Sequence, residues 1–253
     1  MLGKKVKNRV KSKNIYLLNQ TKKQFDELKS RFITTASHEF RTPLTTILTS
    51  SELLLMVGKT IDEEKYLEHI IKIQNAVMYM TSLLDDLLTL NKTELGEWKF
   101  NPSRINLFNF CSKLIETACN MSTVGHKIDL DYMLNEKYAI VDDKLLQHIL
   151  SNLLSNAVKY SPEGGNINMK VMLSLSNLEF IISDNGIGIP KTDQKDIFES
   201  FYRGKNTKGI QGTGLGLAIV KRCIESHGGA IKFKSQLNKG TTFNISIPLM
   251  TIV

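Results

Sequence analysis

The amino-acid sequence predicts two domains of different architecture, an antiparallel helical hairpin followed by an α/β sandwich. Its 253 residues are enough to build more than one small core. Apolar residues recur every seven positions up to about residue 91, which is typical of packed helices. Beyond residue 103, short apolar strands alternate with helices. Two hairpin helices with wide apolar faces cannot bury those faces alone, so we expect the hairpin to dimerise into a four-helix bundle.

The first predicted helix covers residues 4–56. Leu18, Phe25 and Phe32 are seven positions apart and define a heptad seam along it. Pro43 lacks a backbone N–H, so we expect it to kink the helix. The first helix is therefore predicted to be long, to pack along one seam and to bend once.

A second helix is predicted from about residue 62 to residue 91. Acidic residues at its start favour the positive end of the helix dipole. Two apolar series in it keep the heptad spacing: Ile70, Val77 and Leu84, and Ile73, Met80 and Leu87. These series predict a wide apolar face on the second helix of the hairpin.

Residues 92–103 contain Gly96 and Pro102 and predict a linker. The sequence after them predicts strands near 104–106, 127–133, 138–141, 166–174, 178–184, 230–236 and 241–248, and helices near 107–121, 143–160 and 213–227. We expect Asp142-Asp143 to cap the helix at 143–160. Ser176-Asn177 is expected at the turn of a hairpin, and residues 185–212 are expected to be irregular.

The positive charge of the chain is concentrated at its start. Residues 1–31 contain ten Lys or Arg and two acidic residues, whereas the remaining residues carry 23 of each sign. A solvated coiled-coil face explains this excess better than nucleic-acid binding, so no nucleic-acid partner is expected. The stretch could equally follow a membrane helix on its cytoplasmic side in a longer parent protein, and both interpretations stay open.

Composition favours a soluble globular protein in the cytoplasm. The hydrophobic fraction is 42%, the charged fraction is 23%, and no run of 18 apolar residues or signal peptide is present. The three cysteines have no metal-binding spacing and are expected to be buried reduced thiols: Cys111, Cys119 and Cys223. The alternative location is the cytoplasmic portion of a membrane sensor.

One histidine has chemically suggestive neighbours. In Ser37-His38-Glu39-Phe40-Arg41-Thr42-Pro43-Leu44, the histidine is followed directly by a carboxylate. The heptad count places His38 on the flank of the seam, where it can meet a large reactant. A neutral imidazole is a nucleophile near neutral pH, and Glu39 can take or polarise the proton on the other ring nitrogen. A lone histidine on a helix is more often structural, so the interpretation depends on the rest of the chain.

A polar face is predicted on the helix at 143–160. Asn152, Asn156 and Lys159 are four and three positions apart and therefore share one side. Asparagine is a poor helix former, so two of them on one face are unusual for solvation alone. An amide oxygen is a ligand suited to Mg²⁺, and a lysine ammonium can meet a phosphate.

Two glycine-containing segments are further candidates for a nucleotide site. In Asp184-Asn185-Gly186-Ile187-Gly188, the aspartate ends a strand and could accept a hydrogen bond from an amino group such as that of adenine. Gly212-Thr213-Gly214-Leu215-Gly216-Leu217 opens the helix predicted at 213, and backbone N–H groups at a helix start can bind an anion. This second segment matches neither the dinucleotide fingerprint nor the Walker A motif.

Taken together, these segments resemble the sensor histidine kinases of two-component signalling, whose ATP-binding domain belongs to the Bergerat-type ATPase superfamily. The resemblance covers residues 32–243 and includes Phe198-Glu199-Ser200-Phe201-Tyr202-Arg203 and Lys239-Gly240-Thr241-Thr242-Phe243. It implies that His38 is the phosphoacceptor and that Glu39 is the general base. It also implies that Thr42 positions water when the kinase dephosphorylates its partner.

The resemblance also implies how ATP and Mg²⁺ are bound. Asn156 would be the metal ligand with Asn152 alongside, and Lys159 and Tyr160 would lie near the phosphates and the adenosine. Asp184 would read adenine. The remaining implied residues are the glycines Gly186 and Gly188, the γ-phosphate ligand Arg203, the loop Gly212, Thr213, Gly214, Leu215 and Gly216, and Thr241.

The domains implied by the resemblance are a coiled-coil signalling helix (1–31), a dimerisation and histidine phosphotransfer domain (32–91), the linker (92–103) and a catalytic ATP-binding domain (104–253). The expected function is autophosphorylation of His38 within a homodimer, with the catalytic domain moving on the linker. Phosphoryl transfer to an aspartate of a response-regulator receiver domain would follow, together with phosphatase activity toward that regulator. Two alternatives are a related ATPase of the chaperone or topoisomerase type and a non-catalytic dimeric scaffold that binds nucleotide.

Overall fold

The computed structural model describes residues 34–56, 62–94, 97–120, 125–161, 165–207, 209–210 and 212–249. The chain forms two compact units, Met1–Ser82 and Leu83–Val253. The boundary between them falls within one long helix. The predicted segment 1–31 and the seam of Leu18, Phe25 and Phe32 lie outside the described residues. None of the described helices combines the length and apolar character that a membrane crossing requires.

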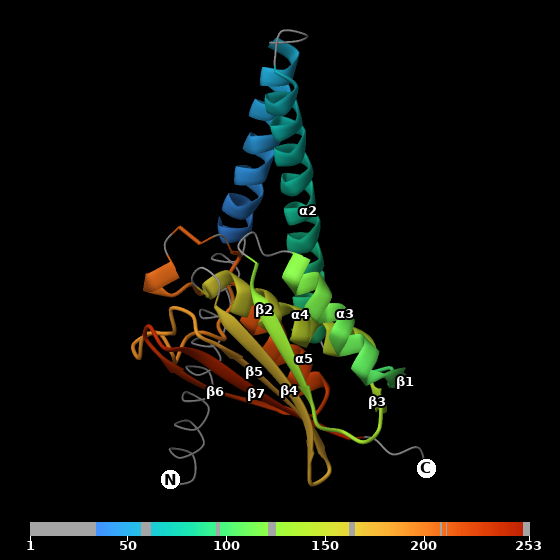
Figure 1. Cartoon of the computed structure of the whole chain (residues 1–253). Helices are drawn as coiled ribbons and strands as arrows, with labels where there is room; N and C mark the ends of the chain where they lie inside the picture. The colour runs from blue at the N-terminus through green and yellow to red at the C-terminus, as the bar shows by residue number, and fades with distance from the viewer. Residues whose placement is uncertain are drawn as a thin grey trace, which may run out of the picture. The chain divides into compact units, whose positions relative to one another are not determined.

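The first unit is a helical hairpin. Residues 34–56 are helical throughout, Pro43 included, and α2 (Glu63–Glu94) begins the return (Figure 1). Threonine hydroxyls of the first helix donate to backbone carbonyls one turn earlier, with O···O distances of 2.9, 3.1 and 2.9 Å at Thr45, Thr46 and Thr49. These bonds satisfy the hydroxyl groups within the helix, so residues with modest helix propensity are compatible with it.

The two apolar series of α2 differ in how far they are covered. In the series Ile73, Met80 and Leu87, the first two side chains are half-buried and the third is buried. In the other series, Ile70 is half-buried, and Val77 and Leu84 are about half exposed. One apolar series of α2 is therefore covered more fully than the other, which leaves Val77 and Leu84 on the surface of the helix.

The second unit contains a five-stranded mixed sheet with the order β2-β4-β5-β7-β6. Only β2 and β4 pair in parallel, and the other neighbours are antiparallel. Its strands are β2 (Lys127–Tyr132), β4 (Asn166–Ser174), β5 (Asn177–Asp184), β6 (Ala230–Gln236) and β7 (Gly240–Pro248). A separate antiparallel pair is formed by β1 (Ser103–Asn106) and β3 (Tyr138–Val141).

Three helices cover one face of this sheet: α3 (Leu107–Asn120), α4 (Asp143–Tyr160) and α5 (Gly216–Ser226) (Figure 1). α4 buries a continuous apolar stripe made of Leu145, Leu146, Ile149, Leu150, Leu153, Leu154 and Ala157. Every second residue of the central strands meets this layer, as in the buried set Ile167, Met169, Val171, Leu178, Phe180 and Ile182. Each such large side chain contributes roughly 1.5–3 kcal/mol on burial. The predicted helical hairpin followed by an α/β sandwich is confirmed.

The Asp142 side chain accepts hydrogen bonds both from the start of α4 and from part of the expected linker. Its Oδ1 accepts hydrogen bonds from the backbone N–H groups of Lys144 and Leu145, both at 3.1 Å, so the predicted cap is confirmed. Its Oδ2 accepts from Trp98 Nε1 at 3.2 Å and from the backbone N–H of Asn101 at 2.9 Å. This buried carboxylate therefore ties residues 98–101 to the start of α4.

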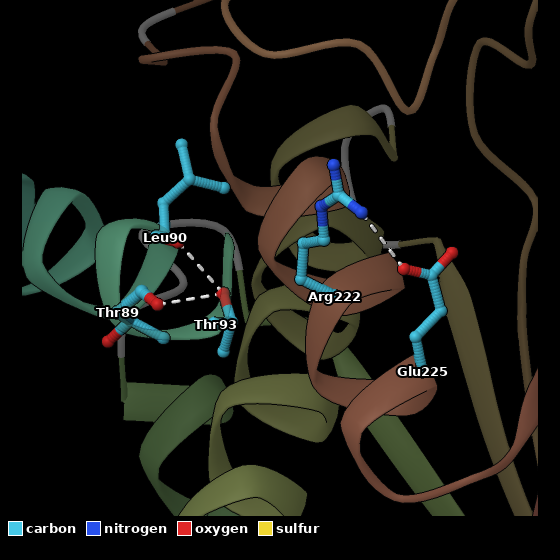
Figure 2. A network of polar contacts seen from close by, with 5 residues as sticks. All are labelled: Thr89, Leu90, Thr93, Arg222 and Glu225. Carbon is cyan, nitrogen blue, oxygen red and sulfur yellow. Dashed lines mark hydrogen bonds and ion pairs between the residues drawn. The ribbon is translucent and has the colours of Figure 1, made fainter. Parts of the chain in front are cut away.

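The last turns of α2 also belong to the second unit. Thr93 Oγ1 donates to the carbonyls of Thr89 and Leu90 at 2.8 and 3.0 Å (Figure 2). Thr89 Oγ1 lies 3.4 Å from Nε2 of His148 in α4. Figure 2 also shows Arg222 of α5 paired with Glu225 one turn later, at 3.2 Å. The end of α2 is thus joined to α4 by a side-chain contact.

Two sequence predictions about local structure were wrong. The helix expected from residue 213 begins at Gly216, because Gly214 has a φ of 72° that no helix contains. The hairpin turn expected at Ser176-Asn177 consists of Leu175 and Ser176. Asn177 already pairs with Pro248 in the sheet, and its side chain donates to Ser246 Oγ at 3.0 Å.

Candidate active site

His38 is presented on the surface of the first helix. Its side chain is exposed, and so is that of Thr42 one turn later. Thr42 Oγ1 donates to the backbone carbonyl of His38 at 3.4 Å, so this hydroxyl is engaged with the helix backbone. The imidazole can be reached by a large reactant in this hairpin.

Glu39 is half-buried and contacts the other helix of the hairpin. The hydroxyl of Tyr79 donates to Glu39 Oε2 at 2.6 Å. A bond of this length between a hydroxyl and a carboxylate is a charge-assisted hydrogen bond. Sequence reasoning missed Tyr79, although its position, three residues after the buried Ala76 and four before the buried Leu83, is a signal that it faces the first helix.

The polar face predicted on α4 is present. Asn152 and Asn156 are half-buried, and Lys159 is exposed on the same side. Asn152 Nδ2 donates to the carbonyl of His148 at 2.9 Å, which leaves its Oδ1 directed elsewhere. In the part of the chain that the structure describes, the Asn156 side-chain amide has no hydrogen bond. An amide oxygen at this position can therefore serve a ligand.

The second glycine segment lies against this face of α4. A Cβ atom on Gly216 would lie 2.6 Å from Asn152 Oδ1, and one on Gly212 would lie 2.8 Å from Lys159 Nζ. A side chain at either glycine would therefore have to displace the Asn152 amide or the Lys159 ammonium, so glycine lets the segment lie directly against these two groups. Tyr160 follows at the end of α4, where burial raises the pKa of its phenol and the positive charge of Arg203 opposes this increase.

Asp184 joins the first glycine segment to β7. Its Oδ1 accepts hydrogen bonds from the backbone N–H groups of Gly186 at 2.9 Å and of Thr241 at 3.1 Å. Burial raises the pKa of this carboxyl, and the two N–H donors oppose the increase. Among the described residues, none donates to Oδ2. Asp184 therefore has one oxygen fixed by the fold and one available to an amino group.

Close packing explains the glycines after Asp184. A Cβ on Gly186 would lie 2.2 Å from the carbonyl oxygen of Tyr160, and that oxygen accepts from the N–H of Ile187 at 2.9 Å. Gly188 has a φ of 64°, and a Cβ there would lie 2.1 Å from the carbonyl oxygen of Gln236. The segment can follow this path only without side chains at both positions.

Hydrogen bonds connect the described residues of the irregular stretch 185–212 to one another and to the second glycine segment. The N–H of Phe201 donates to the carbonyl of Gly214 at 2.9 Å, which ties the stretch to the second glycine segment. Arg203, expected at a γ-phosphate, donates to the carbonyls of Thr207 and Ile210 in its own loop. The structure therefore places Arg203 beside the loop backbone.

Asp193, which sequence reasoning missed, holds the irregular stretch together. It is buried, and its carboxylate accepts from the backbone N–H of Lys205 at 2.9 Å and from Thr192 Oγ1 at 2.8 Å. The Lys205 N–H is the main reason why the pKa of Asp193 is lowered. Asn206 Nδ2 donates to the carbonyl of Gly188 at 2.9 Å. These bonds fix the stretch between the two glycine segments.

The other titratable groups of the second unit have structural surroundings. Burial raises the pKa of the Cys111 and Cys223 thiols to about 12, so neither is a thiolate at neutral pH. Burial lowers the pKa of His148 and His227. His227 stacks edge-on against Phe100, with ring centroids 5.0 Å apart. These side chains pack the core and the linker segment.

Two family descriptions match this chain. Residues 28–96 match the His Kinase A (phospho-acceptor) domain. Residues 141–251 match the Histidine kinase-, DNA gyrase B-, and HSP90-like ATPase. The first match contains His38, and the second contains the polar face of α4 and both glycine segments.

This chain is also similar in sequence to individual histidine kinases. The sensor histidine kinase WalK of Bacillus subtilis is 34% identical over 242 residues, which are 92% of this chain and 39% of WalK. The signal transduction histidine-protein kinase/phosphatase MprB of Mycolicibacterium paratuberculosis is 30% identical over 231 residues, 88% of this chain and 43% of MprB. The chain thus spans less than half the length of these relatives. The solved structure of Acinetobacter baumannii histidine kinase AdeS, at 24% identity, has the same fold, with a TM-score of 0.62 over 85% of this chain and 98% of that chain.

Proposed function

The chain belongs to the sensor histidine kinases, and we propose that it transfers the γ-phosphoryl group of ATP to its own His38 and then to an aspartate of a response regulator. Its second unit contains the match to the kinase-type ATPase, and its first contains the exposed histidine within the phosphoacceptor match. The proposal rests mainly on one observation: both glycine segments pack closely against α4. Gly212 and Gly216 approach Lys159 and Asn152, and Gly186 approaches the end of the same helix.

We propose that the adenine amino group donates to Asp184 and that the phosphates lie beside Lys159. Oδ2 of Asp184 supports the first contact, because it can accept a hydrogen bond and no described residue donates to it. The segment 212–216, which leads into α5, and the Lys159 ammonium support the second, because backbone N–H groups before a helix and a lysine both favour anions. The N–H of Leu215 is an exception, because it donates to Thr213 Oγ1 at 3.1 Å. Arg203 would exchange its loop carbonyls for the γ-phosphate when ATP binds.

Mg²⁺ is the proposed metal, and Asn156 is its proposed protein ligand. A neutral amide oxygen together with phosphate oxygens and water is a donor set suited to this cation. When bound, Mg²⁺ would neutralise charge on the β- and γ-phosphates. We expect Asn156→Ala to weaken ATP binding in Mg²⁺ but not in EDTA, as measured by calorimetry. Equal affinities for the two proteins in Mg²⁺ would contradict the assignment.

The proposed reaction is an in-line phosphoryl transfer. One imidazole nitrogen of His38 forms a bond to the γ-phosphorus, and the bond between this phosphorus and the bridging oxygen breaks, so ADP leaves. The proton on the other ring nitrogen passes to the Glu39 carboxylate. Such a transfer depends mainly on positioning and charge neutralisation. In this proposal His38, exposed and next to Glu39, supplies the nucleophile, and Glu39 supplies the proton acceptor.

A homodimer and a response regulator are the proposed partners. The exposed apolar side chains of the hairpin support dimerisation, because burying them against a second copy is favourable: Leu44, Leu48, Val77 and Leu84. A receiver-domain aspartate would accept the phosphoryl group from His38. Phosphatase activity toward that regulator is proposed for Thr42, which is exposed one turn from His38, and the relative MprB is named a kinase/phosphatase. We place these reactions in the cytoplasm, where ATP is available.

The test is labelling with γ-³²P ATP in the presence of Mg²⁺. We expect the wild-type chain and His69→Gln, a control histidine in the same hairpin, to be labelled and His38→Gln to remain unlabelled. Exposure to acid should remove the label, because phosphohistidine is acid-labile and phosphoserine is not. Nucleotide hydrolysis without labelling would favour a related ATPase, and binding without either would favour a scaffold.

A further inference from the structure

Tyr79 and Glu39 connect the two helices of the hairpin directly beside His38. The two residues are 40 positions apart, and the donor and acceptor oxygens are 2.6 Å apart in a partly buried contact. A phenol keeps its proton at neutral pH, so the tyrosine is the donor and the carboxylate is the acceptor. We propose that Tyr79 is a positioning residue that holds the Glu39 carboxylate for proton transfer from His38. This inference rests on the proposed function.

The packing of α2 explains why a tyrosine occupies this position. Tyr79 lies between the buried residues Ala76 and Leu83, on the side of α2 that faces the first helix. Its ring is half-buried with this apolar series, and its hydroxyl reaches across to the carboxylate. A phenylalanine would keep the packing of the ring and remove the hydroxyl that donates to Glu39. The chain therefore offers a substitution that separates positioning from folding.

The contact matters because Glu39 is a flexible side chain on a helix. Neighbouring residues on a helix point about 100° apart, so Glu39 does not automatically face the imidazole of His38. The bond from Tyr79 engages Oε2 and restricts the side-chain torsions, which leaves Oε1 as the oxygen for the histidine proton. Without this bond, the carboxylate would sample several rotamers, and fewer encounters with ATP would find it in place.

The kinetic consequence is specific. Tyr79 belongs to the hairpin, whereas the proposed ATP contacts belong to the second unit. We therefore expect Tyr79→Phe to lower the kcat of autophosphorylation by on the order of tenfold, with an unchanged KM for ATP. In the background of Glu39→Gln, which removes the proton acceptor, Tyr79→Phe should cause no further loss, because the hydroxyl then has no base to position.

Tyr66→Phe is the matched control. Tyr66 lies on the same helix, but it is exposed. The experiment measures initial rates of His38 labelling over a range of ATP concentrations for the full chain and for Tyr79→Phe, Tyr66→Phe, Glu39→Gln and the double variant Tyr79→Phe/Glu39→Gln. Circular dichroism and sedimentation would show that each variant keeps its helices and its assembly state.

The outcomes distinguish this inference from the function on which it rests. A tenfold lower kcat for Tyr79→Phe, wild-type rates for Tyr66→Phe and no additivity with Glu39→Gln would support the positioning role. A wild-type or faster rate for Tyr79→Phe, or independent losses in the double variant, would overturn it while leaving His38 as the acceptor. If the wild-type chain is not labelled at His38, the proposed function fails and the role of Tyr79 fails with it.

Discussion

The backbone N–H of Thr241 donates to Oδ1 of Asp184 at 3.1 Å and joins two residues that are 57 positions apart. The contact links the end of β5 to the start of β7 and fixes one oxygen of the carboxylate. The other oxygen is left for a ligand, so a substitution that preserves Oδ1 and converts Oδ2 into a donor separates the fold from nucleotide binding.

Asp184→Asn is that substitution. An asparagine can still accept from Gly186 and Thr241, but its NH₂ group cannot accept from the adenine amino group. We expect ATP affinity to fall by roughly 10–100-fold, because a hydrogen bond to a charged group is lost and two donors oppose each other. Calorimetric titration with ATP measures this. Asp129→Asn, at an exposed ion pair with Lys127, should bind ATP normally. Equal affinities for all three proteins would exclude Asp184 from the site.

A comparison of alanine substitutions at Gly188 and Gly228 tests how closely the first glycine segment is packed. Their φ values are 64° and 70°, so alanine is strained to a similar degree at both. A Cβ at Gly188 would meet the carbonyl of Gln236 at 2.1 Å, whereas one at Gly228 would meet nothing. We expect Gly188→Ala to lower the free energy of unfolding by about 1–3 kcal/mol more than Gly228→Ala. Urea unfolding followed by the fluorescence of Trp98, the single tryptophan, measures the difference. Equal losses would show that the loop can move aside.

The sequence predicted most of the fold because its signals were local. The predicted helix 143–160 matches α4 from its cap at Asp142 to its end at Tyr160, since a capping aspartate and an apolar stripe of helical period both lie within it. The heptads of α2 predicted a wide apolar face in the same way. The start of α5 was misplaced, because a glycine in the sequence does not reveal whether its φ will be positive, as it is at Gly214.

The parts of the candidate site that depend on distant residues could not be predicted. Tyr79 contacts Glu39 across the hairpin, and Asp193 accepts from the N–H of Lys205 across 12 positions of irregular chain. Such bonds depend on tertiary packing and leave no periodic pattern. By contrast, the polar face of α4 was visible because Asn152 and Asn156 are separated by one helical turn.

Asp86 near the end of α2 predicts a pH-dependent stability. Burial raises the pKa of this carboxyl to about 6. The folded state therefore binds the proton more tightly than the unfolded state, so the stabilisation is complete below about pH 4 and is lost as the pH rises through about 6. Asp86→Asn is neutral throughout, so we expect it to be more stable than wild type by about 1–3 kcal/mol at pH 7.5 and nearly equal at pH 4.

Urea unfolding at the two pH values tests this prediction. Asp85→Asn is the comparison, because the neighbouring Asp85 side chain is exposed and its charge is a smaller cause of the raised pKa of Asp86 than burial is. Its stability should differ from that of wild type by a smaller amount that changes less with pH. A gain for Asp86→Asn that is the same at pH 4 and pH 7.5 would show that ionisation of Asp86 is not its cause.

The exposed apolar series of the hairpin predicts the oligomeric state. Leu84 is 51% exposed on α2, and Leu173 is 49% exposed on β4. We expect Leu84→Glu to dissociate the dimer, because a charge would then lie in the apolar seam, and Leu173→Glu to leave it intact. Sedimentation equilibrium should give the mass of one chain, 28.6 kDa, for the first variant and twice that mass for the second. A dimeric Leu84→Glu would place the interface elsewhere.

The most direct measurement is to locate the phosphoryl group after incubation with ATP and Mg²⁺. The full chain would be digested at neutral or mildly alkaline pH, which preserves phosphohistidine, and its peptides sequenced by mass spectrometry. We predict phosphorylation of the peptide that contains His38, at the imidazole. A phosphoryl group found on another side chain, or an unmodified His38 after ATP has been consumed, would contradict the proposal that the second unit phosphorylates His38.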